Sequence, residues 1–374
     1  MKLRMMTSPP VRERPTHTQL EFPTARDLGH PPDTRAHTLR WPHALVRGLV
    51  VVTVTALWLL SVEVASATST ATREQSIQLR AGWNSIFIEV EPLVQKPAEL
   101  FAGTPVEIVA AFFPQTHPTT YIKNPGDAPW REEGWQVWYA PQRDDGFLAN
   151  LYSIHGNQAY LIYAQTAFTW SVRGGVNVRS IRWQPNSYNL TGFQVDRSSP
   201  PTFQKFFASS AAHRGQKIYR LIDGVWTPVR DLSTTAMQSG EAYWVYCSGG
   251  SLYQGPISLR LAAGEELSFG SVARDARVEL VNASANSARL VVEPIGIADS
   301  LPLSYVRQDL QNLRTTFPEL PSRLELPVDA GSSQFLRLAA RREKMTAARQ
   351  SMLLRISDGE GVELWLPVVA DRAQ

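Results

Sequence analysis

The chain has 374 residues, of which 43% are hydrophobic and 19% are charged. This length is enough for two or three domains with their own cores, and the composition excludes a small disulfide scaffold and a chain disordered throughout. Residues 1–67 hold 8 of the 37 Lys and Arg and 5 of the 34 Asp and Glu, so the remainder carries 29 of each and is neutral. A nucleic-acid partner is therefore not expected.

The N-terminal part of the sequence predicts export. The uncharged stretch Gly48–Val62 follows Arg47 and precedes a small-residue Ala-x-Ala site that ends at Ala67. This order is typical of a secretory signal peptide, and the stretch is short for a membrane span, which needs about 20 apolar residues. We expect residues 45–67 to be a signal peptide cleaved after Ala67, with an uncleaved membrane anchor as the alternative. Residues 1–44 are interpreted as a disordered leader or a mis-assigned start, and the protein as bacterial and secreted, periplasmic or cell-surface.

The region from residue 75 to residue 260 has the pattern of short β-strands. Its apolar segments are brief, rich in β-branched and aromatic residues, and bounded by Gly, Pro, Asn or Asp. Strands are predicted at Ile77–Leu79, Ile86–Val90, Trp135–Tyr139, Ala159–Tyr163, Phe168–Val172, Ile218–Ile222, Ala242–Cys247 and Ile257–Leu261. Short helices are predicted only at Pro97–Ala102 and Thr202–Ser209.

Two parts of this region resemble each other. The segment Trp83–Val90 matches Tyr188–Val195, with Asn84 aligned on Asn189. Further matches at nearly equal spacing are Phe101 with Phe207, Tyr160 with Tyr243 and Trp170 with Tyr253. The sequence therefore predicts an internal duplication into two related aromatic-rich β domains, 77–178 and 179–258. The first is longer by about 22 residues, which we assign to the Pro-rich loop 114–134, expected to be exposed.

Residues 259–374 contain fewer aromatic residues. Apolar and polar residues alternate in their short segments, as in strands that expose one face to solvent. Strands are predicted at Ala276–Val281, Ala288–Glu293, Arg323–Val328, Gln334–Ala339, Ser351–Ile356 and Val362–Val368. The pair Asp358-Gly359 is a hairpin signal. This pattern predicts an Ig-like β-sandwich, and it leaves open whether the basic tract Arg337–Arg349 is a helix or a long charged hairpin.

Three motifs suggest a relationship. Ala81-Gly82-Trp83-Asn84 follows an apolar strand in the first copy, and Gly240–Tyr246 and Tyr253–Pro256 lie in the second copy. Together they resemble a group of uncharacterised exported bacterial β-proteins in which Gly-Trp-Asn-type repeats precede an Ig-like domain. The resemblance implies a secreted or cell-surface module, and no catalytic residues are carried over with it.

The sequence offers no recognisable catalytic or metal motif. After residue 67 the only histidines are His117, His155 and His213, which are too far apart for a His-Glu-x-x-His site. The single cysteine, Cys247, excludes an internal disulfide and is predicted to be a buried, inert thiol. Acidic doublets such as Asp144-Asp145 point to opposite faces of a strand and are poor catalytic pairs. We therefore expect no enzyme, no cofactor and no metal.

The aromatic residues around the Pro-rich loop are the remaining candidate site. Rings of Tyr121, Trp130, Trp135 and Trp138 would form a platform for sugar stacking, and Asp127 and Arg131 would bind hydroxyl groups. The aromatic residues that recur in both copies are instead expected in the core. The predicted function is an exported non-catalytic binding or scaffolding protein, whose partners are surface polysaccharide or other exported proteins. The alternative is a carbohydrate-binding module, and the third reading is a glycoside hydrolase with dispersed carboxylates.

Overall fold

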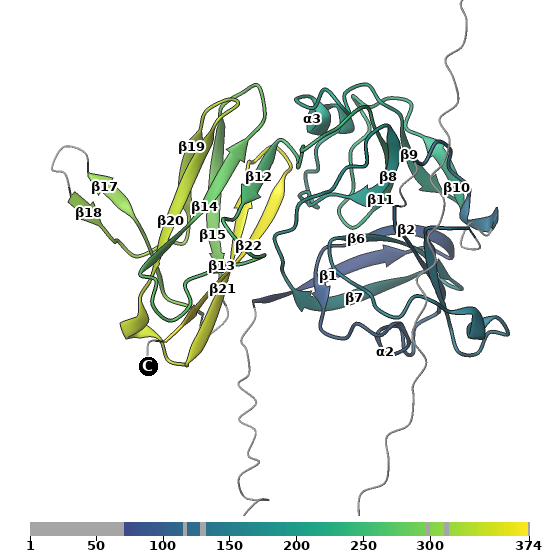
Figure 1. The fold of residues 1–374 in the computed structure, drawn as a ribbon, viewed down its shortest axis with the longest axis horizontal. Coiled ribbons are helices and arrows are strands. Elements are labelled where there is room, and N and C mark those ends of the chain that lie inside the picture. Colours follow the sequence, from purple (N-terminus) through teal and green to yellow (C-terminus); the bar gives the residue numbers. More distant parts are fainter. Residues whose placement is uncertain (1–70, 115–117, 128–131, 297–299, 310–313, 373–374) are drawn as a thin grey trace, which may run out of the picture. The chain divides into compact units, whose positions relative to one another are not determined.

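The computed structural model describes residues 71–372 with gaps at 115–117, 128–131, 297–299 and 310–313. The predicted leader and signal peptide, residues 1–67, lie outside the described residues. Within the described part, no helix has the length and apolar character needed to cross a membrane. The described chain is mostly β, as the sequence predicts (Figure 1).

Two sheets form the first aromatic-rich region. A three-stranded antiparallel sheet has the order β1-β7-β3, and a four-stranded antiparallel sheet has the order β2-β6-β4-β5. The bounds are β1 Thr72–Leu79, β2 Gly82–Ile88, β3 Glu91–Pro92, α2 Pro97–Leu100, β4 Val106–Phe112, η1 Pro125–Asp127, β5 Trp135–Tyr139, η3 Gly146–Leu148, β6 Gln158–Ala164 and β7 Phe168–Gly175.

A second four-stranded antiparallel sheet, with the order β8-β11-β9-β10, follows. The bounds are β8 Ser187–Gly192, α3 Phe203–Phe207, β9 Ile218–Ile222, β10 Val225–Pro228 and β11 Ala242–Cys247. When the strands of each four-stranded sheet are numbered along the chain, their order across the sheet is first, fourth, second, third. The strand order is the same in both sheets.

Side-chain contacts also recur at the matched positions. The Asn84 amide bonds both the N–H and the C=O of Arg80, and Asn189 does the same with Gln184. The Trp83 and Tyr163 rings meet at 5.3 Å and 67°, and those of Tyr188 and Tyr246 at 5.1 Å and 68°. The duplication stays a prediction, and these shared features support it.

The C-terminal region is an Ig-like β-sandwich of two sheets, with the orders β12-β14-β20-β16 and β13-β22-β21-β15-β19. Apolar side chains of both sheets share one core, which includes Leu280, Leu290, Leu338, Leu354 and Leu366. The bounds are β12 Ile257–Arg260, β13 Leu267–Ser268, β14 Asp275–Asn282, β15 Ala288–Ile295, β16 Leu303–Tyr305, β17 Arg307–Asp309, β18 Arg314–Thr316, β19 Leu324–Val328, β20 Ser333–Ala340, η4 Arg342–Lys344, β21 Arg349–Ser357 and β22 Glu363–Asp371. β17 and β18 pair as a separate two-stranded ribbon.

Several elements differ from the prediction. β4 was not predicted because its residues are largely buried, so its sequence does not alternate between apolar and polar residues. The tract Arg337–Arg349 is neither a helix nor a long hairpin, because it comprises the end of β20, the short η4 and the start of β21. The hairpin predicted at Asp358-Gly359 is confirmed, since Ser357 pairs with Glu363 across a connection in which Gly359 has a positive φ of 68°.

The two four-stranded sheets of the aromatic-rich region pack against each other. Ile108, Val137 and Leu161 of the first sheet share a cluster with Trp226 and Trp244 of the second. The other face of the first sheet covers a separate core. The recurring aromatic residues are in these interiors: Tyr160 and Tyr243 are fully buried, Trp170 is buried, and Trp83, Tyr188 and Tyr253 are partly buried against the clusters.

Candidate functional site

A hollow of about 300 Å³ lies along the edge of β8. Its walls combine polar side chains of neutral amide and guanidinium type with apolar rings. The polar groups include Asn157, Asn177, Arg179, Arg182, Gln194 and Gln254, and the rings are Phe87, Phe112, Phe193, Phe206 and Trp365. A volume of this size and a mixed lining are typical of small-ligand sites.

The backbone of β8 contributes to the hollow because β8 is an edge strand. The Tyr188 N–H donates to the Thr119 carbonyl, away from the partner strand β11. Since alternate residues of a strand point their N–H and C=O groups to the same side, Leu190 and Gly192 also present theirs at the open edge. An isolated bridge between Val195 and Val362 covers this edge further along. Among the residues that the structure describes, the edge is thus covered at both ends and open at Leu190 and Gly192.

The matching edge of β2 is closed. The Phe87 N–H donates to the Gly240 carbonyl at 2.9 Å. The Gln75 side chain closes the rest, because its Nε2 donates to the Phe87 carbonyl at 3.0 Å and its Oε1 accepts from the Glu89 N–H at 2.8 Å. The two matching sheet motifs, β2-β6-β4-β5 and β8-β11-β9-β10, therefore differ at one edge. The Gln75 side chain fills the edge of β2, whereas the edge of β8 borders the hollow.

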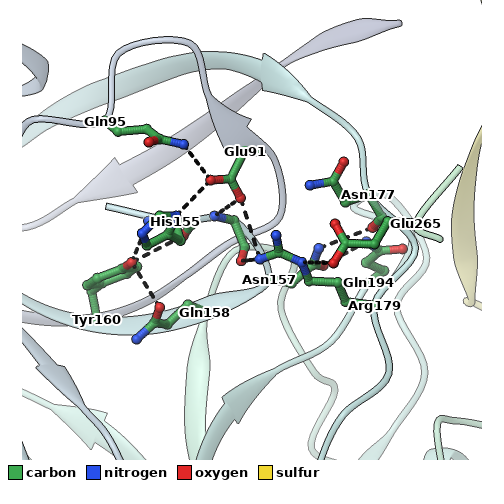
Figure 2. A network of polar contacts seen from close by, with 11 residues as sticks. Glu91, Gln95, His155, Asn157, Gln158, Tyr160, Asn177, Arg179, Gln194 and Glu265 are labelled. Atoms are coloured by element: carbon green, nitrogen blue, oxygen red, sulfur yellow. Dashed lines mark hydrogen bonds and ion pairs between the residues drawn. The ribbon is translucent and has the colours of Figure 1, made fainter. Parts of the chain in front are cut away.

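A polar network centred on Glu91 borders the hollow (Figure 2). One oxygen of Glu91 lies 2.8 Å from His155 Nδ1 and accepts from Gln95 Nε2 at 2.7 Å. The other accepts from the Gly156 N–H at 3.0 Å and lies 3.5 Å from the Arg179 guanidinium. The buried Tyr160 hydroxyl fixes this loop by accepting from the His155 N–H at 2.7 Å.

Arg179 joins this network to a second carboxylate. Its Nε donates to Glu265 at 2.8 Å, and Figure 2 shows the guanidinium between Glu91 and Glu265. The hydrogen bond to Glu265 raises the pKa of Arg179, so this side chain stays cationic. One arginine therefore pairs with two carboxylates at the border of the hollow.

Asn157 connects the network to β8. It adopts a positive φ of 53°, which asparagine tolerates better than most residues. Its Nδ2 donates to the Asn177 carbonyl at 3.1 Å, and its Oδ1 lies 3.5 Å from Gln194 Nε2. These contacts among Asn157, Asn177 and Gln194 thus hold the amide-lined side of the hollow in place, as Figure 2 shows.

The predicted sugar platform does not exist as one surface. Trp135 packs on Phe112 with ring centroids 5.2 Å apart, whereas Trp138 is buried on the opposite face of β5 beside Phe101. Alternation along the strand separates the two rings. Tyr121 is 71% exposed, and Asp127 is also exposed in η1. Trp130 and Arg131 lie outside the described residues.

In its described parts the Pro-rich loop 114–134 is mostly exposed, as expected, but some of its residues bind the second sheet. Its Thr119 bonds the backbone of Tyr188 and the Ser187 hydroxyl, and Asn124 Oδ1 accepts from the Trp226 N–H at 2.8 Å. Ile122 packs on the cluster between the two four-stranded sheets. The described parts of the loop therefore fasten the first sheet to the second.

The acidic doublets are used in ion pairs. Glu265 binds Arg179 while Glu266 binds Arg349, and Asp145 binds Arg143. Among the residues that the structure describes, no group of three or more His, Cys, Asp or Glu side chains is arranged to hold a metal ion. Cys247 is fully buried, and burial raises the pKa of its thiol, which confirms the prediction of a buried cysteine.

The sequence analysis missed the hollow and its network. Glu91, Asn157 and Arg179 are isolated polar residues, and strand pairing brings them together from separate segments. The usable signal was the difference between the two motifs, in which Phe87 aligns with Gly192. A loss of side chain at an otherwise matched apolar position indicates a place where another group approaches the backbone.

No protein-family model matches the chain. No curated protein matches it either. Among solved structures, it is similar to the ASH/PapD-like domain of human CEP192, with 9% identity over 32% of this chain and 86% of that chain and a TM-score of 0.20. It is also similar to Escherichia coli alpha-2-macroglobulin activated by porcine elastase, with 9% identity over 80% of this chain and 33% of that chain and a TM-score of 0.20.

Proposed function

We propose that the protein is an exported, non-catalytic binding and scaffolding protein of the bacterial surface or secretome, and that the hollow along β8 is its ligand site. The observation that supports this most is the division of groups around the hollow. The carboxylates Glu91 and Glu265 are engaged with Arg179, while neutral amides and aromatic rings remain to line the wall. Such a lining recognises a ligand by hydrogen bonds and apolar contact.

The same division weighs against a glycoside hydrolase at this place. Such an enzyme needs one carboxylic acid that stays protonated and a second carboxylate across the cleft. Glu91 and Glu265 instead bind one guanidinium, that of Arg179, and Glu91 also holds the loop at His155 and Gly156. They are therefore better suited to fixing the loops than to transferring a proton.

A carbohydrate-binding module is the second candidate. The lining favours it, because Asn, Gln and Arg side chains beside aromatic rings are suited to hydroxyl groups and to the apolar face of a sugar. The surface partners would then be polysaccharides, with other exported proteins as the alternative partners.

Two experiments test the proposal. N-terminal sequencing of the native protein is expected to begin at Thr68, and an intact N-terminus in the cytoplasm would contradict export. The full-length chain, as its host processes it, is then screened on a glycan array and with chromogenic glycosidase and esterase substrates. We expect binding without turnover. Turnover that is lost in a Glu91→Gln variant would assign a catalytic site instead.

A further inference from the structure

We infer that the hollow binds its ligand through a secondary amide, the group shared by an N-acetylated sugar and a short peptide. The ligand amide carbonyl would accept from the Gly192 N–H at the open edge of β8, as the Gly240 carbonyl accepts from the Phe87 N–H at the edge of β2. This inference rests on the proposed binding function and names the chemistry of its ligand.

The first motif shows the bonding pattern. Gln75 is buried, and its side-chain amide bridges the carbonyl of Phe87 and the N–H of Glu89. A strand edge presents such an acceptor and donor two residues apart, and a carboxamide offers the complementary donor and acceptor. In the first motif, amide groups of the protein itself thus fill the edge that we propose a ligand amide fills in the second.

The second motif has the same edge without the amide. Aligning Asn84 with Asn189 places Gly192 at the position of Phe87, and Gln194 at that of Glu89. Gly192 is buried, and among the described residues its edge-facing N–H has no hydrogen-bond partner. Its carbonyl receives only the Thr191 hydroxyl at 3.3 Å. A buried backbone N–H without a partner is rare and unfavourable, so a ligand that satisfies it gains affinity.

A change in one side chain explains why the second edge stays open. Asn84 bonds a residue four positions earlier, whereas Asn189 bonds one five positions earlier, so the second motif has one extra residue. Counting back with this insertion places Arg179 at the position of Gln75. Its guanidinium is held by Glu265 and Glu91 and does not bridge the edge.

The remaining lining limits what the amide is attached to. Phe87 and Phe193 lie beside the open edge and suit a methyl group, such as that of an acetamide. Asn177, Arg182 and Ser258 line the same hollow and suit hydroxyl or carbonyl oxygens. A volume of about 300 Å³ favours a ligand of monosaccharide or dipeptide size.

Titration of the full-length chain with small probes tests the inference. The probes are N-acetylglucosamine, glucose and N-acetylalanine methylamide, and calorimetry measures the binding of each. We expect at least one amide probe to bind about tenfold or more tighter than glucose, since only the amide probes offer a carbonyl to the buried Gly192 N–H. Preference for the sugar or for the peptide probe identifies the source of the amide. Binding of glucose as tight as that of both amide probes overturns the inference but leaves a binding function, and binding by none of the probes overturns it too.

Backbone NMR locates the contact. On saturation with the bound amide probe, the amide signals of Gly192 and Gln194 are expected to shift. Those of Phe87 and Glu89 serve as an internal control, since their N–H groups are already bonded. Unchanged signals of Gly192 and Gln194 contradict the proposed contact.

A blocking variant provides an independent test. Ser180 is exposed and lines the hollow, so Ser180→Trp is expected to fill the hollow and weaken binding about tenfold or more without unfolding the protein. Ser209→Trp is the matched control, because Ser209 is also exposed and lines a different hollow of about 700 Å³. Equal loss in both variants, or no loss in Ser180→Trp, overturns the assignment of the site.

Discussion

Phe87 and Gly192, which hold matching positions in the two aromatic-rich motifs, lie against each other. A Cβ atom built on Gly192 would come within 2.3 Å of the Phe87 Cβ and 2.8 Å of the Glu241 carbonyl. The Phe87 ring thus occupies the space that a second side chain would need. This asymmetry lets the two sheets approach closely, and it leaves the Gly192 backbone beside the hollow.

The close approach predicts that Gly192→Ala destabilises the protein. Overpacking a buried site costs about 1–3 kcal/mol, and chemical denaturation in urea measures it. In a Phe87→Gly background the same change is expected to cost less, because the Phe87 Cβ and Cγ atoms that block the new methyl group are both removed. Equal costs in both backgrounds would show that Phe87 is not the limiting contact.

The two buried tyrosines are expected to contribute alike. Tyr160 accepts from the His155 N–H and Tyr243 from the Gln238 N–H, both at 2.7 Å. Removing either hydroxyl leaves a backbone donor unpaired, so Tyr160→Phe and Tyr243→Phe should each lower the free energy of unfolding by about 1–3 kcal/mol. Tyr152→Phe, at a position that is 76% exposed, is the control and should be neutral. A large effect in only one of the buried pair would argue against equivalent roles.

The buried His213 predicts a loss of stability in mild acid. Desolvation lowers the pKa of His213 to about 4. In the unfolded state the His213 pKa is about 6.5, so the unfolded chain binds a proton more readily than the folded one. The contribution of neutral His213 to stability is therefore complete above pH 6.5 and is lost as the pH falls through 4. The total loss is on the order of 3 kcal/mol.

Comparison with a His213→Phe variant separates the loss of stability caused by protonation of His213 from that caused by protonation of carboxylates. His213 packs between the rings of Trp183 and Phe207, so phenylalanine fits the surroundings in kind. The stability difference between the two proteins, from urea denaturation, should change between pH 7 and pH 4 in favour of the variant. A difference independent of pH would show that His213 does not titrate in this way.

The two acidic residues of the network are expected to differ in importance. Glu91 interacts with four groups and is 18% exposed, whereas Glu265 is 46% exposed and its side chain binds Arg179 alone among the described residues. Glu91→Ala should therefore cost about 2–3 kcal/mol, and Glu265→Ala about 0–1 kcal/mol. Glu91→Gln, which keeps part of the hydrogen bonding, should fall between them. Thermal and urea denaturation at low and high salt would check the order, which is reversed if Glu265 holds the loops.

The native thiol is expected to be unreactive. Cys247 is fully buried, and its raised pKa keeps it protonated near neutral pH. Reaction with a disulfide reagent should be slow in buffer and become fast on unfolding in urea. Fast labelling of the folded protein would indicate that this strand opens.

Local patterns in the sequence were sufficient to predict most of the strands and the kind of fold. The bounds Trp135–Tyr139 and Ala242–Cys247 agree with β5 and β11, because each strand is a short apolar run between turn residues. The matched Asn and Tyr positions also predicted similar interiors in the two copies. Their side chains bond backbone groups only five residues away along the chain. Such features depend on neighbours along the chain.

The candidate site depended on contacts between distant segments. Trp138 looked like part of a binding platform, and only the pairing of β5 with β4 decided that its ring faces the core. Glu91, Arg179 and Glu265 meet across separate elements, and the open edge of β8 depends on where Arg179 turns. The sequence by itself determined which segments become strands and which rings are repeated. The tertiary structure decided which strand edge stays open, because this depends on which distant side chain reaches it.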